Sequence, residues 1–457
     1  MKISKILALV LAAALAFSCL GISAFAADDD ASAADAPLDL EKMAADDALL
    51  LNIADFFRGT DKGLELDRAP TRAEAATILV RMLCAEAKAA SEKNDHPFTD
   101  VKTTSAWASD NVGYLYKNGL TRGISDTKFG DRDLVSAKQF YTFCLRALGY
   151  TEGEDFTYDE AVGKAAALGV IDPAVAAAID GKAVFTRGDM ATAMRSTLDA
   201  LPAGAEDKLV DSLASDGSVS EYSAEILNGT NEVFNFLKEA EKDDALNMTA
   251  DIKAKVDIAS GLSKYSTDLS GKMKYDMSSD LSSFKCYVEV ETKLEDEDVL
   301  VSMYMEDDRL YTKEEGVWET SEEGSAAISG ILESLRSAAP LSISVGSMYK
   351  DLTLTKADGA VTIAGKMDVS SIMGSAFMQS IAGADMLGAM KIGDIELTCV
   401  YDEATKEIKS SRALYSIEFS DGAAVTIITY DLEATFYDYG KTVITLEKEL
   451  QDLIAGN

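Results

Sequence analysis

Charged side chains stand one to three places after a hydroxyl residue at three points of the chain. They are Arg72 and Glu74 after Thr71, Lys138 after Ser136, and Arg187 and Asp189 after Thr186. Arg offers a carboxylate or phosphate a planar fork of permanently charged N–H donors. Where a helix begins nearby, its unpaired backbone N–H groups add to the attraction. An Arg at such a helix start is therefore suited to contact an anionic ligand.

The hydroxyl residues also indicate where three helices begin. The aligned stretches are 70–83, 135–148 and 185–198, with Thr71, Ser136 and Thr186 at one position. A hydroxyl at that position caps a helix N-terminus by accepting a backbone N–H. Three places on, Glu74 and Gln139 complete a capping box, whereas Asp189 is expected only to suit the positive end of the helix dipole. Apolar residues follow at helical spacing, so the chain contains three unequal helical repeats.

The composition excludes several classes of partner. A formal net charge of −35 and a pI near 4.3 argue against binding to nucleic acid or to anionic lipid. A local cationic pocket can still bind an anion, because salt confines the far field to about 8–10 Å. Beyond the N-terminal leader no stretch reaches the roughly 18 apolar residues of a membrane span, so no transmembrane segment is expected.

The inventory of reactive side chains argues against catalysis. His96 is the only histidine, which removes Ser-His-Asp chemistry and multi-histidine metal sites. In a chain with 78 acidic residues, a pair of carboxylates does not indicate a glycosidase site. The acidic turns at Glu295 and Glu306 lack the calcium-loop pattern. We therefore expect no cofactor, no metal and no enzymatic activity.

Four cysteines follow the leader, at positions 84, 144, 286 and 399, and none forms a CxxC pair. Buried thiols are the favoured interpretation. A bridge between Cys286 and Cys399 is the alternative, which spacing alone does not decide.

The first 26 residues have the pattern of a secretory signal peptide. Two lysines precede an apolar run, and the small residues 24–26 suit signal peptidase. Ordinary cleavage is favoured over lipoprotein processing at Cys19, because no Leu stands three residues before it. Residues 27–44 are acidic and Ala-rich and predict a flexible lead-in. The chain is therefore expected to be exported.

The second repeat has the fullest pattern, and it resembles the S-layer homology (SLH) domain. The matching residues are Phe98, Asp100, Val101, Trp107, Ala108, Leu115, Tyr116, Gly119, Leu120, Gly123, Phe129 and the closing 146–150 "RALGY". Residues 71–74 read "TRAE", the family's tetrapeptide. The resemblance covers residues 45–202, as repeats of about 45–90, 96–150 and 154–202. It implies a three-repeat helical module on the cell surface that binds secondary cell-wall polymer, often a pyruvylated polysaccharide.

The resemblance carries the binding role to Arg72, Glu74, Arg187 and Asp189. The second repeat departs from the pattern, because Ala137 stands at the Arg position and only Lys138 follows it. Asp131 also stands where the family often has Pro. Trp107, Tyr114 and Tyr116 are favoured as core residues, with stacking on sugars as the alternative. The wall affinity could accordingly be weaker than usual, or lost.

The character of the chain changes near residue 245, after a predicted helical linker at 203–244. Ile252, Ala254, Val256 and Ile258 alternate with charged residues, as expected of a strand with one buried face. Residues 271–277, 394–401, 413–419 and 423–439 predict further strands. Helical insertions are expected at 322–339 and 370–381. Residues 245–457 thus predict an antiparallel β-sheet domain, and the fold class is α followed by α+β.

The element order of this second half resembles the LolA-like lipoprotein-carrier fold, in which a large curved antiparallel sheet wraps around a few helices. The resemblance implies a hydrophobic or lipid ligand. Met273, Met277, Met303 and Met305 are candidates for the lining of such a cavity, although ordinary core filling is the favoured interpretation.

Three functions follow from the sequence. The first is a non-enzymatic protein held on the cell wall by its repeats and displaying the sheet domain. The second is a surface enzyme that acts on glycans and uses the repeats as an anchor. The third is a carrier whose repeats only support the sheet domain and have no affinity for the wall.

Overall fold

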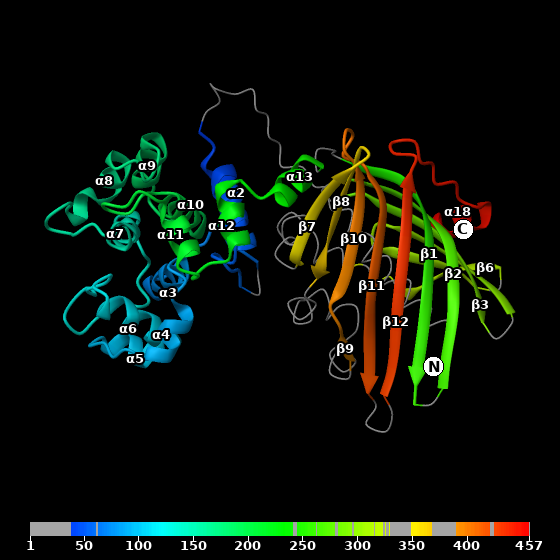
Figure 1. Cartoon of the computed structure of the whole chain (residues 1–457), viewed down its shortest axis with the longest axis horizontal. Coiled ribbons are helices and arrows are strands. Elements are labelled where there is room, and N and C mark those ends of the chain that lie inside the picture. The colour runs from blue at the N-terminus through cyan, green and yellow to red at the C-terminus, as the bar shows by residue number, and fades with distance from the viewer. Residues whose placement is uncertain are drawn as a thin grey trace. The chain divides into compact units, whose positions relative to one another are not determined.

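A computed structural model of the chain describes residues 38–60, 63–240, 245–261, 263–278, 282–294, 297–314, 316–322, 325, 329, 349–367, 390–420 and 425–456. The predicted signal peptide and most of the predicted lead-in and helical insertions lie outside these ranges. The chain divides into a helical unit that ends at Asn231 and a sheet unit that begins at Glu232 (Figure 1). None of the described helices is both long enough and apolar enough to cross a membrane.

The helical unit consists of short helices joined by tight turns. Its α-helices are α2 (Leu40–Ile53), α3 (Arg72–Met82), α4 (Glu86–Glu92), α5 (Thr99–Thr104), α6 (Ser109–Lys117), α7 (Ala137–Ala147), α8 (Ala161–Ala167), α9 (Pro173–Asp180), α10 (Arg187–Leu198), α11 (Leu209–Ser215) and α12 (Glu221–Asn228), with the 3-10 turns η1 (Ala106–Ala108) and η2 (Tyr158–Glu160). The chain enters α2 at Leu40, whereas the prediction placed residues up to 44 in a flexible lead-in. The Asp39 carboxylate caps this helix by accepting from two backbone N–H groups.

The three predicted helix starts are confirmed. Thr71, Ser136 and Thr186 cap α3, α7 and α10, and each forms a full capping box with the residue three places on. Asp189 therefore does more than complement the helix dipole. Its carboxylate also accepts from the Thr186 N–H at 2.9 Å, as Glu and Gln do in the other two boxes.

The loops of the first two repeats correspond residue by residue. A backbone bridge joins Thr60 to Gly63 in the first loop, and the same bridge joins Ser125 to Lys128 in the second. The residue numbers of matched positions differ by 65 throughout: 60 and 125, 63 and 128, 64 and 129, 68 and 133, 71 and 136. The offset that relates the helix caps therefore also relates the loops before them.

The segment predicted as a helical linker divides between the two units. Helices α11 and α12 belong to the helical unit, where α12 packs against α2 and α11 against α10. The Arg195 side chain on α10 donates to the Leu227 carbonyl at 2.5 Å and fastens α12 in place. Helix α13 (Glu232–Ala240) belongs to the sheet unit, where Val233 and Phe236 enter the core.

The described part of the sheet unit forms one twelve-stranded antiparallel sheet. Its strands are β1 (Ala245–Ser260), β2 (Ser263–Ser278), β3 (Phe284–Leu294), β4 (Glu297–Glu306), β5 (Arg309–Glu314), β6 (Val317–Thr320), β7 (Tyr349–Ala357), β8 (Ala360–Met367), β9 (Met390–Ile392), β10 (Ile395–Asp402), β11 (Ile408–Ser420) and β12 (Val425–Tyr437). The order is β6-β5-β4-β3-β2-β1-β12-β11-β10-β8-β7, with β9 beside β11. The first and last strands thus pair in the middle of the sheet (Figure 1).

The alternation predicted for these strands is confirmed. Ala254 and Val256 on β1 are buried, and Ile252 and Ile258 pack against the same core. The four methionines proposed as a cavity lining are all buried in this core: Met273, Met277, Met303 and Met305. The favoured core-filling interpretation therefore describes them.

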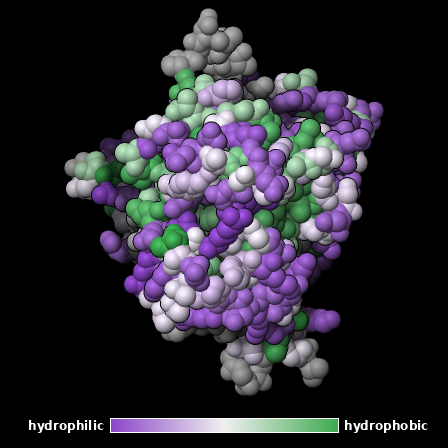
Figure 2. Space-filling view, turned by 90° about the vertical axis from the view of Figure 1, so that its left-hand side faces the viewer, coloured by the Kyte–Doolittle hydropathy of each residue, from purple (hydrophilic) through white to green (hydrophobic). Residues whose placement is uncertain are grey.

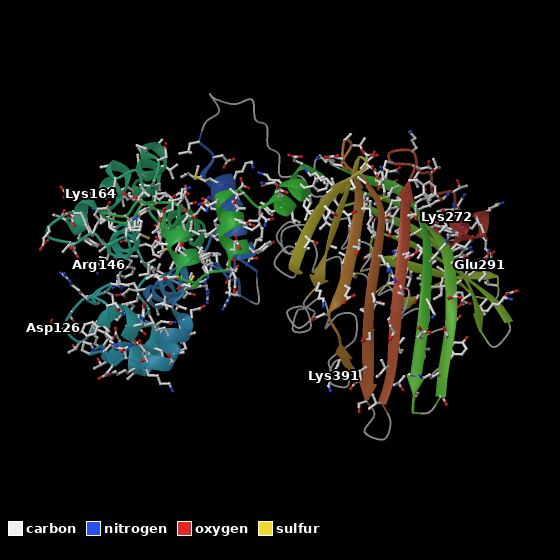
Figure 3. All side chains as sticks on the ribbon, in the orientation of Figure 1. Asp126, Arg146, Lys164, Lys272, Glu291 and Lys391 are labelled. Atoms are coloured by element: carbon white, nitrogen blue, oxygen red, sulfur yellow. The ribbon has the colours of Figure 1, made fainter. Side chains whose placement is uncertain are left out.

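The opposite face of the sheet carries charged residues and a small second core. Lys272 on β2, labelled in Figure 3, lies 3.3 Å from the Asp251 carboxylate and donates to the Tyr437 hydroxyl at 2.7 Å. Helix α18 (Lys448–Ile454) covers the second core, whose buried members are Tyr304, Tyr311, Trp318 and Leu450. An open depression beside α18 is lined by two apolar and three charged residues, namely Trp318, Lys448, Glu449, Asp452 and Leu453.

The described cysteines 84, 144, 286 and 399 all remain thiols, and the last three are buried. The alternative bridge between Cys286 and Cys399 is therefore wrong, and the favoured interpretation as buried thiols is confirmed for all but Cys84, which is half-buried. Burial raises the pKa of Cys144 and Cys399 to about 12, so both stay protonated at neutral pH.

Asp47 on α2 predicts a pH dependence of stability. Burial raises its pKa to about 6, although Thr192 and Arg195 lower it in part. The carboxyl of Asp47 thus binds a proton more readily in the folded chain than in the unfolded chain. Its ionisation therefore lowers the free energy of unfolding. This loss is complete above pH 6 and disappears as the pH falls to about 4. We expect Asp47→Asn to raise the free energy of unfolding by about 1–2 kcal/mol at pH 7.5.

Denaturant unfolding of wild type and Asp47→Asn at pH 7.5 and pH 4.5 checks this expectation. Other carboxylates titrate equally in both proteins, so the difference between the two isolates Asp47. That difference should shrink at pH 4.5. A constant difference at both pH values would show that Asp47 is not the titrating group.

Candidate ligand site at the junctions between helical repeats

Arg72, the first predicted site residue, joins the first repeat to the second. Its side chain is only 4% exposed. The Nε group donates to the Phe129 carbonyl at 2.9 Å, and the guanidinium lies over the rings of Phe129 at 4.9 Å and Phe143 at 5.6 Å. The backbone N–H of Arg72 donates to the Asp133 carbonyl at 2.9 Å. Cation–π contacts and a buried hydrogen bond thus fasten α3 to the loop of the next repeat.

Arg187 joins the third repeat to the first in the same way. Its Nε donates to the Leu64 carbonyl at 2.9 Å, and one Nη donates to the Arg58 carbonyl at 3.0 Å. The guanidinium lies 4.8 Å from the centre of the Phe57 ring. The backbone N–H of Arg187 donates to the Arg68 carbonyl, which is the position that matches Asp133.

The two arginines therefore occupy equivalent places, with matched Nε acceptors at 64 and 129 and matched backbone acceptors at 68 and 133. Burial lowers the pKa of both guanidinium groups, although an Arg stays charged at any ordinary pH. Both side chains hold neighbouring repeats together, a role that their position in the tetrapeptide did not predict.

The two predicted acidic residues are held at their helix starts. Arg68 donates both Nη groups to the Glu74 carboxylate, at 3.0 and 2.8 Å. Burial alone would raise the pKa of Glu74, but the bonds from Arg68 and Thr71 outweigh it and lower the pKa. Asp189 is buried and accepts from the Lys182 Nζ at 2.6 Å.

The junction between the second and third repeats lacks the arginine. Ala137 occupies the position of the arginine. The Lys138 Nζ forms an ion pair at 3.2 Å with the carboxylate of Asp159, whose side chain is 84% exposed. The two repeats meet through Phe140 and Phe185, whose ring centres are 5.7 Å apart. Lys138 therefore does not replace the arginine. The departure of the second repeat from the family pattern therefore leaves this junction without the clamp that Arg72 and Arg187 provide at the other two.

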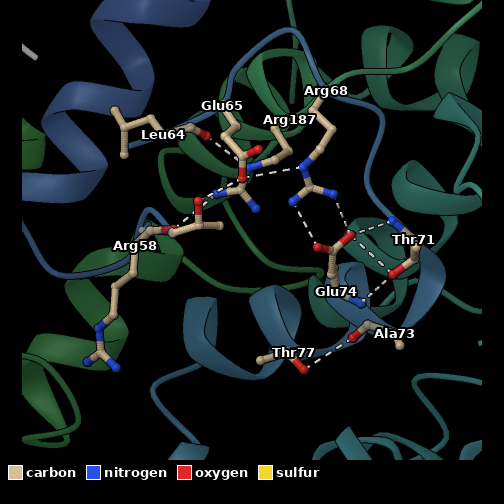
Figure 4. A network of polar contacts seen from close by, with 10 residues as sticks. Arg58, Leu64, Glu65, Arg68, Thr71, Ala73, Glu74, Thr77 and Arg187 are labelled. Carbon is tan, nitrogen blue, oxygen red and sulfur yellow. Dashed lines mark hydrogen bonds and ion pairs between the residues drawn. The ribbon is translucent and has the colours of Figure 1, made fainter. Parts of the chain in front are cut away.

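Arg58 and Arg68 lie at the junction between the third and first repeats (Figure 4). The sequence did not predict either of them as a site residue. Arg58 pairs with Asp55 at 2.8 Å and with Glu86 at 3.7 Å, while Arg68 pairs with Glu74 and lies 3.5 Å from Glu65. Figure 4 shows Arg68 between Glu65 and Glu74, with Arg187 nearby. No signal in the sequence marked these two arginines, because the matched positions of the second loop are Gly123 and Asp133.

Several apolar side chains of the helical unit face solvent. Trp107 is 61% exposed, so the prediction that it belongs to the core is wrong, and Tyr116 is exposed as well. The side of the molecule seen in Figure 2 is largely hydrophilic, with hydrophobic residues in small groups. Trp107 lies on η1, which packs against α3. Because its ring faces solvent, it is accessible for stacking on a sugar, which was the alternative interpretation.

Two residues from the motif of the second repeat shape its loop. The Asp100 carboxylate accepts from the backbone N–H groups of Phe129 and Gly130, at 3.0 and 2.7 Å. Asp131, which stands where related repeats often have Pro, accepts from the Ser105 hydroxyl at 2.6 Å. Both carboxylates fix the loop that receives Arg72.

The single histidine is part of the helical core. His96 is buried, with its Nε2 3.0 Å from the Ser109 hydroxyl and its Nδ1 accepting from the Phe98 N–H. Burial lowers its pKa. Throughout the described ranges, no three His, Cys, Asp or Glu side chains gather as metal ligands would.

Comparison with protein families matches residues 97–130 to the "S-layer homology domain" and residues 229–441 to a "Family of unknown function (DUF6612)". The chain is 32% identical over 140 residues to a "Cell surface protein" of Thermoanaerobacter kivui, a match that covers 30% of this chain and 18% of the relative. It is 32% identical over 146 residues to a "Surface layer protein" of Brevibacillus choshinensis, covering 32% and 13%. A "Middle cell wall protein" of Brevibacillus brevis is 32% identical over 148 residues, covering 32% and 14%.

These curated relatives are much longer proteins, of which the chain spans less than a fifth. The predicted resemblance to the S-layer homology domain is confirmed, and the matches indicate a protein of the cell surface. Among solved structures, LprF of Mycobacterium bovis matches with a TM-score of 0.27 and 12% identity, over 48% of this chain and 97% of LprF. The open antiparallel sheet and the order α followed by α+β agree with the predicted fold class.

Proposed function

We propose that the helical unit attaches the chain non-covalently to an anionic secondary cell-wall polysaccharide, and that the protein is a non-enzymatic component of the cell surface that displays the sheet unit. The observation that carries this proposal is the matched pair of junctions at Arg72 and Arg187. Each junction sets a capped helix start against the loop of another repeat. A pyruvylated polysaccharide would supply the carboxylates that such a charged junction recognises.

The sedimentation of the exported chain with protein-stripped wall sacculi tests the proposal. We expect the protein to pellet with sacculi that retain their secondary polymer and to stay in solution after the polymer has been extracted. Pelleting that is unchanged by the extraction would assign the affinity to peptidoglycan. The absence of pelleting in both cases would contradict the proposal and favour the carrier function.

The functional role of the sheet unit is a separate proposal. A hydrophobic or lipid ligand is supported by the resemblance of the element order of this unit to the lipoprotein-carrier fold. Delipidated protein incubated with radiolabelled fatty acid should retain label after gel filtration. A glycan-acting surface enzyme is the other candidate, and the release of reducing sugar from sacculi would support it instead.

A further inference from the structure

His96 supports a group of aromatic rings at the start of the second repeat. Its side chain is 3% exposed, and its ring stacks on the Phe98 ring with the two centres 5.5 Å apart. The Phe98 ring in turn lies 5.6 Å from the Phe129 ring and 5.3 Å from the Tyr116 ring. The Phe129 carbonyl is the acceptor of the Arg72 Nε group. His96 is therefore linked, through Phe98, to the residue that receives Arg72.

The turn formed by residues 94–98 has little free space on either side. A Cβ atom at position 123 would overlap the Phe98 ring, and Gly123 also has a φ of +70°, so the second loop approaches this ring as only a glycine allows. On the other side, a Cβ atom at Gly113 of α6 would overlap the Asn94 carbonyl. Small shifts of Phe98 therefore cannot absorb a lost hydrogen bond at His96.

The hydrogen bonds of His96 define its protonation state. Its Nδ1 accepts from the Phe98 backbone N–H at 3.2 Å, so the neutral ring carries its proton on Nε2, which lies 3.0 Å from the Ser109 hydroxyl. An imidazolium has a proton on both nitrogens and accepts no hydrogen bond. Protonation would therefore set two N–H donors against each other and leave a buried backbone N–H without its acceptor.

Three charged groups act on the His96 ring. Asp95 and Asp100 favour the imidazolium, whereas Lys102 opposes it. Lys102 pairs with Asp95 at 2.7 Å, and the Asp100 carboxylate accepts from backbone N–H groups of the second loop. From α6 the ring meets the Ser109 hydroxyl, which is uncharged. Burial has the largest influence, and it lowers the pKa of His96 from the ordinary value of 6.5.

We propose that His96 is a pH-sensitive latch: its neutral ring holds the turn at residues 94–98 closed, and its protonation in a mildly acidic medium opens the turn and loosens the second loop from Arg72. The opened turn binds a proton more readily than the closed one, so the closed form is fully favoured above pH 6.5 and loses this advantage as the pH falls. A protein of the cell surface meets the pH of the medium directly. The latch operates whether or not the helical unit binds a wall polymer.

His96→Asn is the matched variant that does not titrate. The side-chain oxygen of an Asn at this position can accept from the N–H of Phe98, two residues on, as Asn commonly does when it begins a turn before a Pro. The variant therefore keeps the acceptor and removes the proton-binding group. Circular dichroism at pH 7.5 checks that its helical unit is folded.

Hydrogen exchange of the full exported chain, measured by mass spectrometry, reports the opening of the turn. Peptides that span residues 94–101 and 127–135 are compared between the two proteins at the same pH, so that the intrinsic pH dependence of exchange cancels. We expect equal rates within about twofold at pH 7.5. At pH 5.5, wild type should exchange about three- to tenfold faster, because each pH unit below the free pKa changes the equilibrium by up to about tenfold. A peptide from α10 should not differ at either pH.

Nuclear magnetic resonance provides the second measurement. Because His96 is the only histidine, ¹⁵N-histidine labelling of the untagged chain gives the signals of a single ring. We expect the proton on Nε2 at pH 7.5 and a titration midpoint below 6.5.

Three results would overturn the latch. They are a neutral ring with its proton on Nδ1, a titration at the ordinary value with no change in exchange of the turn, and equal exchange of wild type and His96→Asn at pH 5.5. If His96→Asn has lost its fold, wild type alone still decides. The protection of its residues 94–101 relative to that of α10 should then fall by the same factor between pH 7.5 and pH 5.5, and a constant ratio would contradict the proposal.

Discussion

Replacement of Arg187 by Ala is expected to lower the free energy of unfolding of the helical unit by about 3 kcal/mol. The variant leaves the carbonyls of Leu64 and Arg58 without their buried donor and removes the guanidinium from the Phe57 ring. A lost hydrogen bond to a charged group costs about 1.5–3 kcal/mol, and the lost cation–π contact adds about 1. Because Arg187 ties the third repeat to the first, the loss should act on the whole unit.

Urea unfolding followed by circular dichroism at 222 nm measures this change, since most helices of the described chain lie in the helical unit. Arg187→Lys is the matched variant, because it keeps the charge but cannot serve two carbonyls with one planar fork. It should recover less than half of the loss. Arg122→Ala, at an exposed position, is the control and should stay within about 0.5 kcal/mol of wild type. An unchanged midpoint for Arg187→Ala would show that the clamp contributes nothing to stability.

This expectation changes how binding experiments on the chain are interpreted. Substitution of Arg72 or Arg187 alters the contacts between repeats and therefore the shape of every groove. A loss of wall affinity in such variants would not distinguish a lost ligand contact from a distorted junction. The exposed Arg58 and the half-buried Arg68 give a cleaner test, because their side chains are not the buried link between repeats.

Local signals in the sequence predicted the helical repeats well. Helix caps depend on residues within three places of one another, so Thr71 and Glu74 could be paired by spacing alone. The alternation of Ala254 and Val256 likewise predicted which face of β1 is buried, because side chains alternate along any strand. Both properties are fixed by neighbouring residues.

Contacts between distant residues were beyond the reach of the same reasoning. The acceptors of Arg187 lie more than 120 positions earlier, and β1 pairs with β12 from the far end of the domain. Trp107 stands at helical spacing but on a short 3-10 turn whose outer side faces solvent, so periodicity misplaced it. A capping residue and a ligand-binding residue look alike in sequence until the partner loop is known.

Gly113 in α6 provides the second large expected effect, and its direction opposes helix propensity. In the middle of a helix, Gly→Ala usually stabilises by about 1 kcal/mol. At this position a Cβ atom would lie 1.9 Å from the Asn94 carbonyl oxygen, which belongs to the backbone. Relief of that overlap requires α6 to move away from the segment that carries His96. We therefore expect Gly113→Ala to destabilise the helical unit by about 3 kcal/mol.

Gly163 in α8 is the matched control, because it is also a helical glycine but an added Cβ there would meet no described atom within 4 Å. Gly163→Ala should follow propensity alone and raise the free energy of unfolding by up to about 1 kcal/mol. Urea unfolding of both variants thus yields shifts of opposite sign if close backbone approach determines the glycine at 113. Two shifts in the stabilising direction would mean that α6 can move at little cost, and that the tight contact with Asn94 is not required for the packing of the second repeat.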